Sequence, residues 1–117
     1  MAKKKVYVPD RGDLVWLSLD PRVGREQAGE RPVYVLSTKE FSEATGYALV
    51  CPVTSRVRGG PFEVKVRSDG ISGVVLCDQA KSVDYVARKA RFAGEAPPSV
   101  VADVLEAVAA IIGATED

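Results

Sequence analysis

Short apolar runs rich in β-branched residues, each closed by glycine, proline or aspartate, fill most of residues 6–86 and restrict this chain to a small β structure. Strands are predicted at residues 14–19, 33 to about 37, 47–53, 62–66 and 73–77, with an extended segment from 80 to about 86. Residues 39–45 form either a short helix or an irregular connection, which Gly46 ends. Strands this short bury a shared core in a strongly bent antiparallel sheet or an open barrel.

One amphipathic helix follows the strands. Pro97 and Pro98 open it, at positions where the missing N–H of proline is harmless, and Gly113 ends it. Apolar residues recur between them at spacings of three and four, and they give the helix one apolar face that we expect to pack on the sheet: Val101, Val104, Leu105, Val108, Ile111 and Ile112. The 117 residues are enough for one domain and too few for two, so residues 1–117 are predicted to form a single domain.

The residue inventory excludes several kinds of chemistry. The chain has no histidine, and its two cysteines, Cys51 and Cys77, form no Cys-x-x-Cys pair, which rules out a zinc site and any catalytic dyad or triad built on histidine. Both cysteines lie in apolar β-rich runs and are interpreted as buried core thiols. No apolar run approaches the roughly 20 residues that span a bilayer, and no apolar segment follows the basic N-terminus as in a signal peptide, so we expect a cytoplasmic protein that binds no membrane.

The net charge of zero conceals an uneven distribution. Residues 1–91 hold all 16 basic and 11 of the 16 acidic residues, a net charge of +5, whereas residues 92–117 hold five acids and no base. A basic body of this kind favours an anion-binding face. If they share one rim of the barrel, eight side chains would attract phosphates: Arg25, Arg31, Arg56, Arg58, Lys81, Arg88, Lys89 and Arg91.

Three polar segments adjoin the predicted strands and could build a cleft there. In the first, residues 24–32, glycines at both ends leave Arg25, Glu26 and Gln27 mobile, whereas Pro32 and the following strand anchor Arg31. The second is Thr54-Ser55, whose hydroxyls either form a turn or serve the site. The third segment follows the strand that ends near Cys77 and contains an acid, an amide and a base: Asp78, Gln79 and Lys81.

This set of groups could cleave RNA without histidine. Cleavage needs a base for the 2′-hydroxyl, a cationic or hydrogen-bonding group for the reacting phosphate, and an acid for the leaving 5′-oxygen. Glu26 or Asp78 could be the base, Arg31 could neutralise the phosphorane, and Thr54 could donate a hydrogen bond to it. The high pKa of arginine makes electrostatic stabilisation its safer role. The scheme requires no metal and no cofactor.

The motifs resemble those of the MazF/PemK (Kid) family of toxin endoribonucleases. They are Gly12-Asp13-Leu14-Val15-Trp16, Gly24-Arg25-Glu26-Gln27-Ala28-Gly29-Glu30-Arg31-Pro32, Pro52-Val53-Thr54-Ser55 and Cys77-Asp78-Gln79-Ala80-Lys81-Ser82, in one order from about residue 7 to 113. The resemblance implies an SH3-like barrel with a C-terminal helix that forms a homodimer. It further implies metal-independent cleavage of single-stranded RNA, such as mRNA, to 2′,3′-cyclic phosphate and 5′-hydroxyl ends. A cognate MazE-like antitoxin would fill the RNA groove with its disordered acidic tail.

The resemblance also assigns roles to residues. Arg31 and Thr54 match the family's catalytic arginine and threonine, and Glu26 matches its nearby acid. Leu76 stands where some members have a functional arginine, which favours Arg31 as the phosphate-handling group. The predicted RNA-binding set is Arg25, Gln27, Ser55, Arg56, Arg58, Asp78, Gln79, Lys81 and Arg88.

Two other functions fit the same barrel. A non-enzymatic toxin of the CcdB type poisons gyrase through a C-terminal helix that includes an aromatic residue, whereas the helix here ends Ala109-Ala110-Ile111-Ile112-Gly113. An RNA-binding module without catalysis is the second, but both Arg31 and Thr54 are present.

Overall fold

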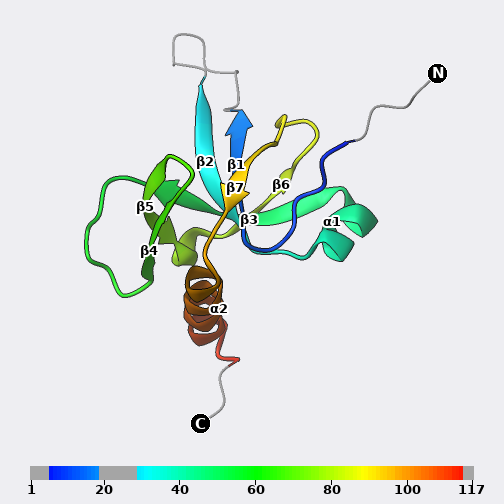
Figure 1. The fold of residues 1–117 in the computed structure, drawn as a ribbon. Helices are drawn as coiled ribbons and strands as arrows, with labels where there is room; N and C mark the ends of the chain where they lie inside the picture. Colours follow the sequence, from blue (N-terminus) through cyan, green and yellow to red (C-terminus); the bar gives the residue numbers. More distant parts are fainter. Residues whose placement is uncertain (1–5, 19–28, 115–117) are drawn as a thin grey trace, which may run out of the picture.

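A computed structural model describes residues 6–18 and 29–114 of the chain. In this part, seven strands form one curled antiparallel sheet in the order β4-β5-β3-β2-β1-β7, with β6 paired to β3 (Figure 1). The elements along the chain are β1 (Asp13–Ser18), β2 (Glu30–Val35), α1 (Lys39–Thr45), β3 (Tyr47–Thr54), β4 (Glu63–Ser68), β5 (Ile71–Leu76), the 3-10 turn η1 (Cys77–Gln79), β6 (Lys81–Asp84), β7 (Arg91–Glu95) and α2 (Pro98–Ile112).

Strand β3 organises the sheet because it pairs with three neighbours. One of its edges pairs with β2, from Val35 opposite Val50 to Val33 opposite Pro52. The other edge pairs first with β6, along 47–50, and then with β5, along 53–54. Between these two pairings lies Pro52, which has no N–H to donate, and the chain crosses from β5 to β6 there through η1. Strand β3 therefore exchanges β6 for β5 along this edge, and the sheet bends there.

The bent sheet buries side chains on both of its faces. Alternate residues of β2 point to opposite sides, so that Tyr34 joins one core cluster with Leu14 and Val104, whereas Val33 and Val35 join the other. Helix α2 packs on the first cluster through Val100 and Val104. The fold is thus mainly β, a curled half-barrel with a C-terminal helix, and this confirms the predicted fold class. None of the described helices is long and apolar enough to cross a membrane.

Local sequence signals placed several elements correctly. Of the two interpretations of residues 39–45, the helix is right: Thr38 caps its first turn by accepting from the N–H of Phe41, and Gly46 ends it in the left-handed region at φ +81°. The turn at 68–70 is a two-residue hairpin loop in which Asp69 and Gly70 both have positive φ, as a type I′ turn requires.

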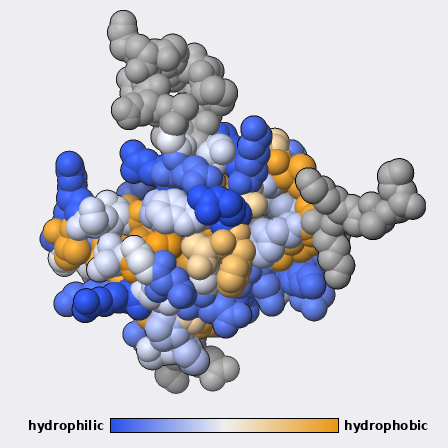
Figure 2. Space-filling model, turned by 45° about the horizontal axis from the view of Figure 1, so that its top comes forward, coloured by the Kyte–Doolittle hydropathy of each residue, from blue (hydrophilic) through white to orange (hydrophobic). Residues whose placement is uncertain are grey.

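Three predictions were incomplete or wrong. Strand β7 was not predicted, and β2 begins at Glu30 rather than at residue 33. The apolar face of α2 does not pack wholly on the sheet. Leu105, Ile111 and Ile112 at its C-terminal half are 37, 40 and 69% exposed. Figure 2 shows one face of the molecule, on which apolar patches lie among mostly hydrophilic residues. The buried residues of α2, Val100 and Val104, lie in its first half.

Candidate functional site

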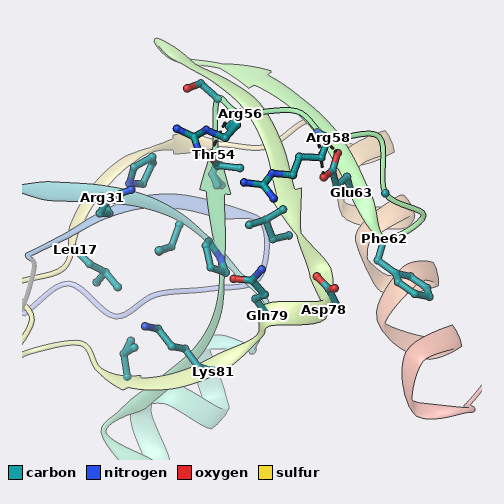
Figure 3. Close-up of a pocket in the computed structure, with 18 of the residues that line it drawn as sticks. Leu17, Arg31, Thr54, Arg56, Arg58, Phe62, Glu63, Asp78, Gln79 and Lys81 are labelled. Carbon is teal, nitrogen blue, oxygen red and sulfur yellow. Dashed lines mark hydrogen bonds between the residues drawn. The ribbon is translucent and has the colours of Figure 1, made fainter.

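A groove of about 1000 Å³ opens where β3 changes neighbour (Figure 3). Its wall contains parts of β1, β2, β3, the 55–61 loop, η1 and β6, together with Arg88 from the turn before β7. Nine side chains that the sequence singled out line this one groove: Arg31, Thr54, Ser55, Arg56, Arg58, Asp78, Gln79, Lys81 and Arg88. The expected convergence of polar strand ends on one rim is therefore confirmed. Arg25, Glu26 and Gln27 lie outside the described residues.

Arg31 is held by the sheet rather than by a loop. It lies in β2, directly opposite Leu17 of β1, and its side chain is exposed on the groove wall. Pro32 follows it and fixes the backbone within the strand. The neighbouring Glu30 forms an ion pair with Arg91 of β7, so the start of β2 is tied to a second strand besides β1. The strand thus fixes the backbone position from which Arg31 extends its charge into the groove.

Thr54 ends β3, which places its hydroxyl at the groove. Its Oγ1 accepts a hydrogen bond of 3.1 Å from the backbone N–H of Arg56. Because this bond uses an acceptor site of the oxygen, the hydroxyl hydrogen can point to a ligand. The backbone of β5 approaches closely here, since a Cβ on Gly73 would lie 2.1 Å from the carbonyl oxygen of Thr54. Glycine at 73 thus permits the contact that holds Thr54 in place.

The crossover between β5 and β6 brings Asp78, Gln79 and Lys81 to the opposite wall of the groove. All three are exposed, and Figure 3 shows them on the side of the groove across from Thr54 and Arg56. The backbone N–H of Cys77 donates to the carbonyl oxygen of Phe62 at 3.1 Å, which joins the start of η1 to the residue before β4. The polar segment after β5 is therefore part of the site and has a defined backbone.

Glu63 is a groove residue that the sequence did not reveal. It is the first residue of β4, and its carboxylate accepts from the backbone N–H groups of Arg58, at 3.2 and 3.3 Å, and Gly59, at 2.9 Å. Its own N–H donates to the carbonyl oxygen of Gly60. The only signal in the sequence is an acid placed three residues after Gly59-Gly60, where a loop with positive φ can fold back on it.

Positive charge dominates the groove. Among the described residues, its lining holds five cations, namely Arg31, Arg56, Arg58, Lys81 and Arg88, against two acids, namely Glu63 and Asp78. Lys89 and Arg91, which the sequence grouped with them, do not line the groove, and Arg91 is engaged with Glu30. A groove with this balance attracts a polyanion.

Metal ligands and nucleophilic thiols are not found at this groove in the described part of the chain. No three Cys, Asp or Glu side chains there lie close enough to hold a metal ion together. Both cysteines are free and buried, as predicted, and burial raises the pKa of Cys51 to about 12 and that of Cys77 to about 11. Thiols with such values stay protonated at neutral pH and are poor nucleophiles.

Comparison with known proteins agrees with this geometry. Residues 10–112 match the family described as PemK-like, MazF-like toxin of type II toxin–antitoxin system. The chain belongs to this family. It is 41% identical over 107 residues to the endoribonuclease toxin MazF of Escherichia coli K12, which covers 92% of this chain and 96% of that protein. It is 35% identical over 108 residues to the Escherichia coli endoribonuclease PemK, covering 88% of this chain and 81% of that one.

A solved structure of a MazF relative has the same fold. The MazE–MazF complex from Deinococcus radiodurans (Form-II) superposes with a TM-score of 0.86 at 45% sequence identity, over 94% of this chain and 100% of that chain. The predicted resemblance to the MazF/PemK family is therefore confirmed. The groove described above lies on a MazF-type half-barrel.

Proposed function

We propose that this MazF/PemK-family protein is a toxin of a type II toxin–antitoxin pair that acts as a sequence-specific endoribonuclease on single-stranded RNA, including mRNA. The observation that carries the proposal is the groove, which Arg31 of β2 and Thr54 of β3 line together with three further arginines and Lys81. The names of the MazF and PemK relatives support the same reaction class. Such a protein would inhibit translation and growth by destroying messages in the cytoplasm.

The groove residues supply the groups that 2′-hydroxyl attack requires. A base removes the 2′-hydroxyl proton, the 2′-oxygen forms a bond to phosphorus, and the bond to the 5′-oxygen breaks. Arg31 stabilises the charge on the non-bridging oxygens, and the Thr54 hydroxyl donates to one of them. The leaving 5′-oxygen takes up a proton from water, which gives a 2′,3′-cyclic phosphate and a 5′-hydroxyl end. The base is Glu26 or Asp78. Asp78 stands exposed on the groove wall, and Glu26 lies outside the described residues.

Two protein partners belong to the proposal. The first is a cognate MazE-like antitoxin, whose acidic tail would occupy the cationic groove in place of RNA; the Deinococcus relative forms a MazE–MazF complex. The second is another copy of this chain. The exposed Leu105, Ile111 and Ile112 on α2 form an apolar surface that a homodimer would cover.

The decisive experiment replaces Arg31. Arg31→Ala is expected to lower the cleavage rate by about 10³-fold, because it removes the fixed charge that faces the phosphate. Arg67→Ala is the matched control, since Arg67 is exposed on β4 and does not line the groove. Sequencing the 5′ ends of RNA fragments made by the purified protein would detect cleavage and define the recognised sequence together. Near-normal turnover by folded Arg31→Ala would contradict the proposal.

A further inference from the structure

The 55–61 loop between β3 and β4 carries two of the five groove cations, and side chains hold both of its ends. At the first end, the backbone N–H of Arg56 donates to Oγ1 of Thr54. At the second end, the carboxylate of Glu63 accepts from the backbone N–H groups of Arg58 and Gly59. The loop residues themselves are exposed, so packing contributes little to their conformation. These hydrogen bonds, rather than burial, define where the loop lies.

The hydrogen bonds of Glu63 with residues 58–60 close a ring between the loop and the start of β4, here called the Glu63 ring. While its carboxylate accepts from Arg58 and Gly59, its own backbone N–H donates to Gly60 at 3.3 Å. Gly59 adopts φ +79°, and the chain after it turns back so that Glu63 meets the two successive N–H groups of Arg58 and Gly59. A hydrogen bond to a charged acceptor is stronger than a neutral one, so this end of the loop is the more firmly held of the two.

The hydrogen bonds of Glu63 affect the groove because Arg58, whose backbone they hold, is one of its lining residues. Figure 3 shows its backbone bonded to Glu63 and its side chain extending back into the groove. Rotating the backbone of residues 58–59 would redirect this guanidinium by several ångströms, because the side chain is long. Glu63 also contributes negative charge to a groove proposed to bind a polyanion, which would be unfavourable if the carboxylate did nothing else.

From these contacts we propose that Glu63 is a positioning residue that fixes the 55–61 loop and thereby sets which RNA sequence the groove accepts. This inference rests on the proposed endoribonuclease function. The carboxylate acts through the backbone of Arg58 and Gly59, so it determines where Arg58 meets the RNA rather than how fast the phosphate reacts. Loss of the ring therefore relaxes sequence selectivity more than it slows the cleavage step.

The test separates the acceptor role of Glu63 from its charge. Glu63→Gln removes the charge but keeps an oxygen that accepts N–H groups, whereas Glu63→Ala removes both. We expect Glu63→Ala to lower the ratio of cleavage at the preferred site to cleavage at single-base variants by about tenfold, and Glu63→Gln to stay within about threefold of the unmodified protein. Trypsin should cut after Arg56 or Arg58 at least tenfold faster in Glu63→Ala only. Glu43→Ala, in α1, removes one exposed negative charge away from the groove and serves as the control.

Gly59 provides a second pair of variants should Glu63→Ala fail to fold. A Cβ there meets nothing within 4 Å, so only the positive φ resists substitution. Gly59→Ala should relax selectivity as Glu63→Ala does, and Gly59→Asn, which tolerates this φ, should not. Equal effects of Glu63→Ala and Glu63→Gln, with both binding RNA more tightly, would overturn the proposal in favour of a simple charge effect. If no variant cleaves RNA, the proposed function fails, and the trypsin comparison still decides whether Glu63 holds the loop.

Discussion

The Thr54 hydroxyl has two separable tasks in this structure, and substitutions can distinguish them. Its oxygen accepts the backbone N–H of Arg56, while its hydrogen is available to the reacting phosphate. Thr54→Val keeps the shape of the side chain and removes both tasks, whereas Thr54→Ser keeps both and removes only a methyl group. We expect Thr54→Val to slow cleavage by about 10²-fold and Thr54→Ser to remain within about threefold of the unmodified protein.

The size of the effect follows from where Thr54 lies. Removing one hydrogen-bond donor from a developing oxyanion typically costs 10²- to 10³-fold in rate. Thr54 is only half-buried in an open groove, where water weakens electrostatic interactions, so the lower end of that range applies. Losing the bond to Arg56 should lower the free energy of unfolding by about 1 kcal/mol, which leaves a folded protein.

Single-turnover cleavage of a short RNA at saturating enzyme measures the chemical step, and titration of the enzyme measures RNA affinity separately. The reasoning predicts that Thr54→Val lowers the rate at saturation, with a smaller change in affinity. A Thr54→Val rate within threefold of the unmodified rate would refute the donor role. A Thr54→Ser variant as slow as Thr54→Val would refute it differently, because it would assign the effect to packing of the methyl group. Thermal unfolding of each variant provides the control for folding.

Four further predictions concern the groove and the core. Cleavage should persist in excess EDTA, and strict dependence on a divalent ion would contradict this. A plot of log RNA affinity against log salt concentration should have a slope near −3.5 if all five groove cations contact phosphates, and a slope near zero would be the contrary result. Tyr34→Phe should raise the free energy of unfolding by about 1 kcal/mol in urea titrations, because its buried hydroxyl has no hydrogen-bond partner among the described residues; a loss of 1 kcal/mol would contradict this. Burial raises the pKa values of Cys51 and Cys77 to about 12 and 11, so the thiols of the unfolded chain lose their protons first. The contribution of these two thiols to stability should therefore be level below about pH 8 and fall from about pH 9 upward, and the double Ala variant should show a weaker fall.

Features of this protein that depend on neighbouring residues could be predicted from the sequence. The hairpin turn at Asp69-Gly70, the glycine ends of α1 and α2 and the proline opening of α2 all follow from the backbone preferences of single residues. The groove residues could be predicted as well, because polar side chains at the ends of apolar strands have few structural reasons to be there. The family's motifs then assigned roles to Arg31 and Thr54.

Features that depend on long-range contacts were missed. Strand β7, with the sequence Arg-Phe-Ala-Gly-Glu, has no clear alternation and exists because β1 offers it a free edge. The hydrogen bonds of Glu63 could not be predicted from the sequence, because their donors are backbone N–H groups, which every residue except proline has. The exposed end of α2 was misjudged because periodicity identifies an apolar face and says nothing of how far the sheet extends beneath it.

The position of Pro52 explains why binding residues gather where they do. A residue with an N–H at 52 could let β3 keep one neighbour along its whole length, so that β5 and β6 would compete for the same edge. With Pro52 there, β6 pairs up to Val50 and β5 begins at Val53, and η1 must bridge the gap. That bridge carries Asp78 and Gln79 to the groove opposite Thr54. The change of neighbour along β3 thus places η1 at the groove and supplies one of its walls, which makes the Pro52 position more important to the site than its apolar side chain suggests.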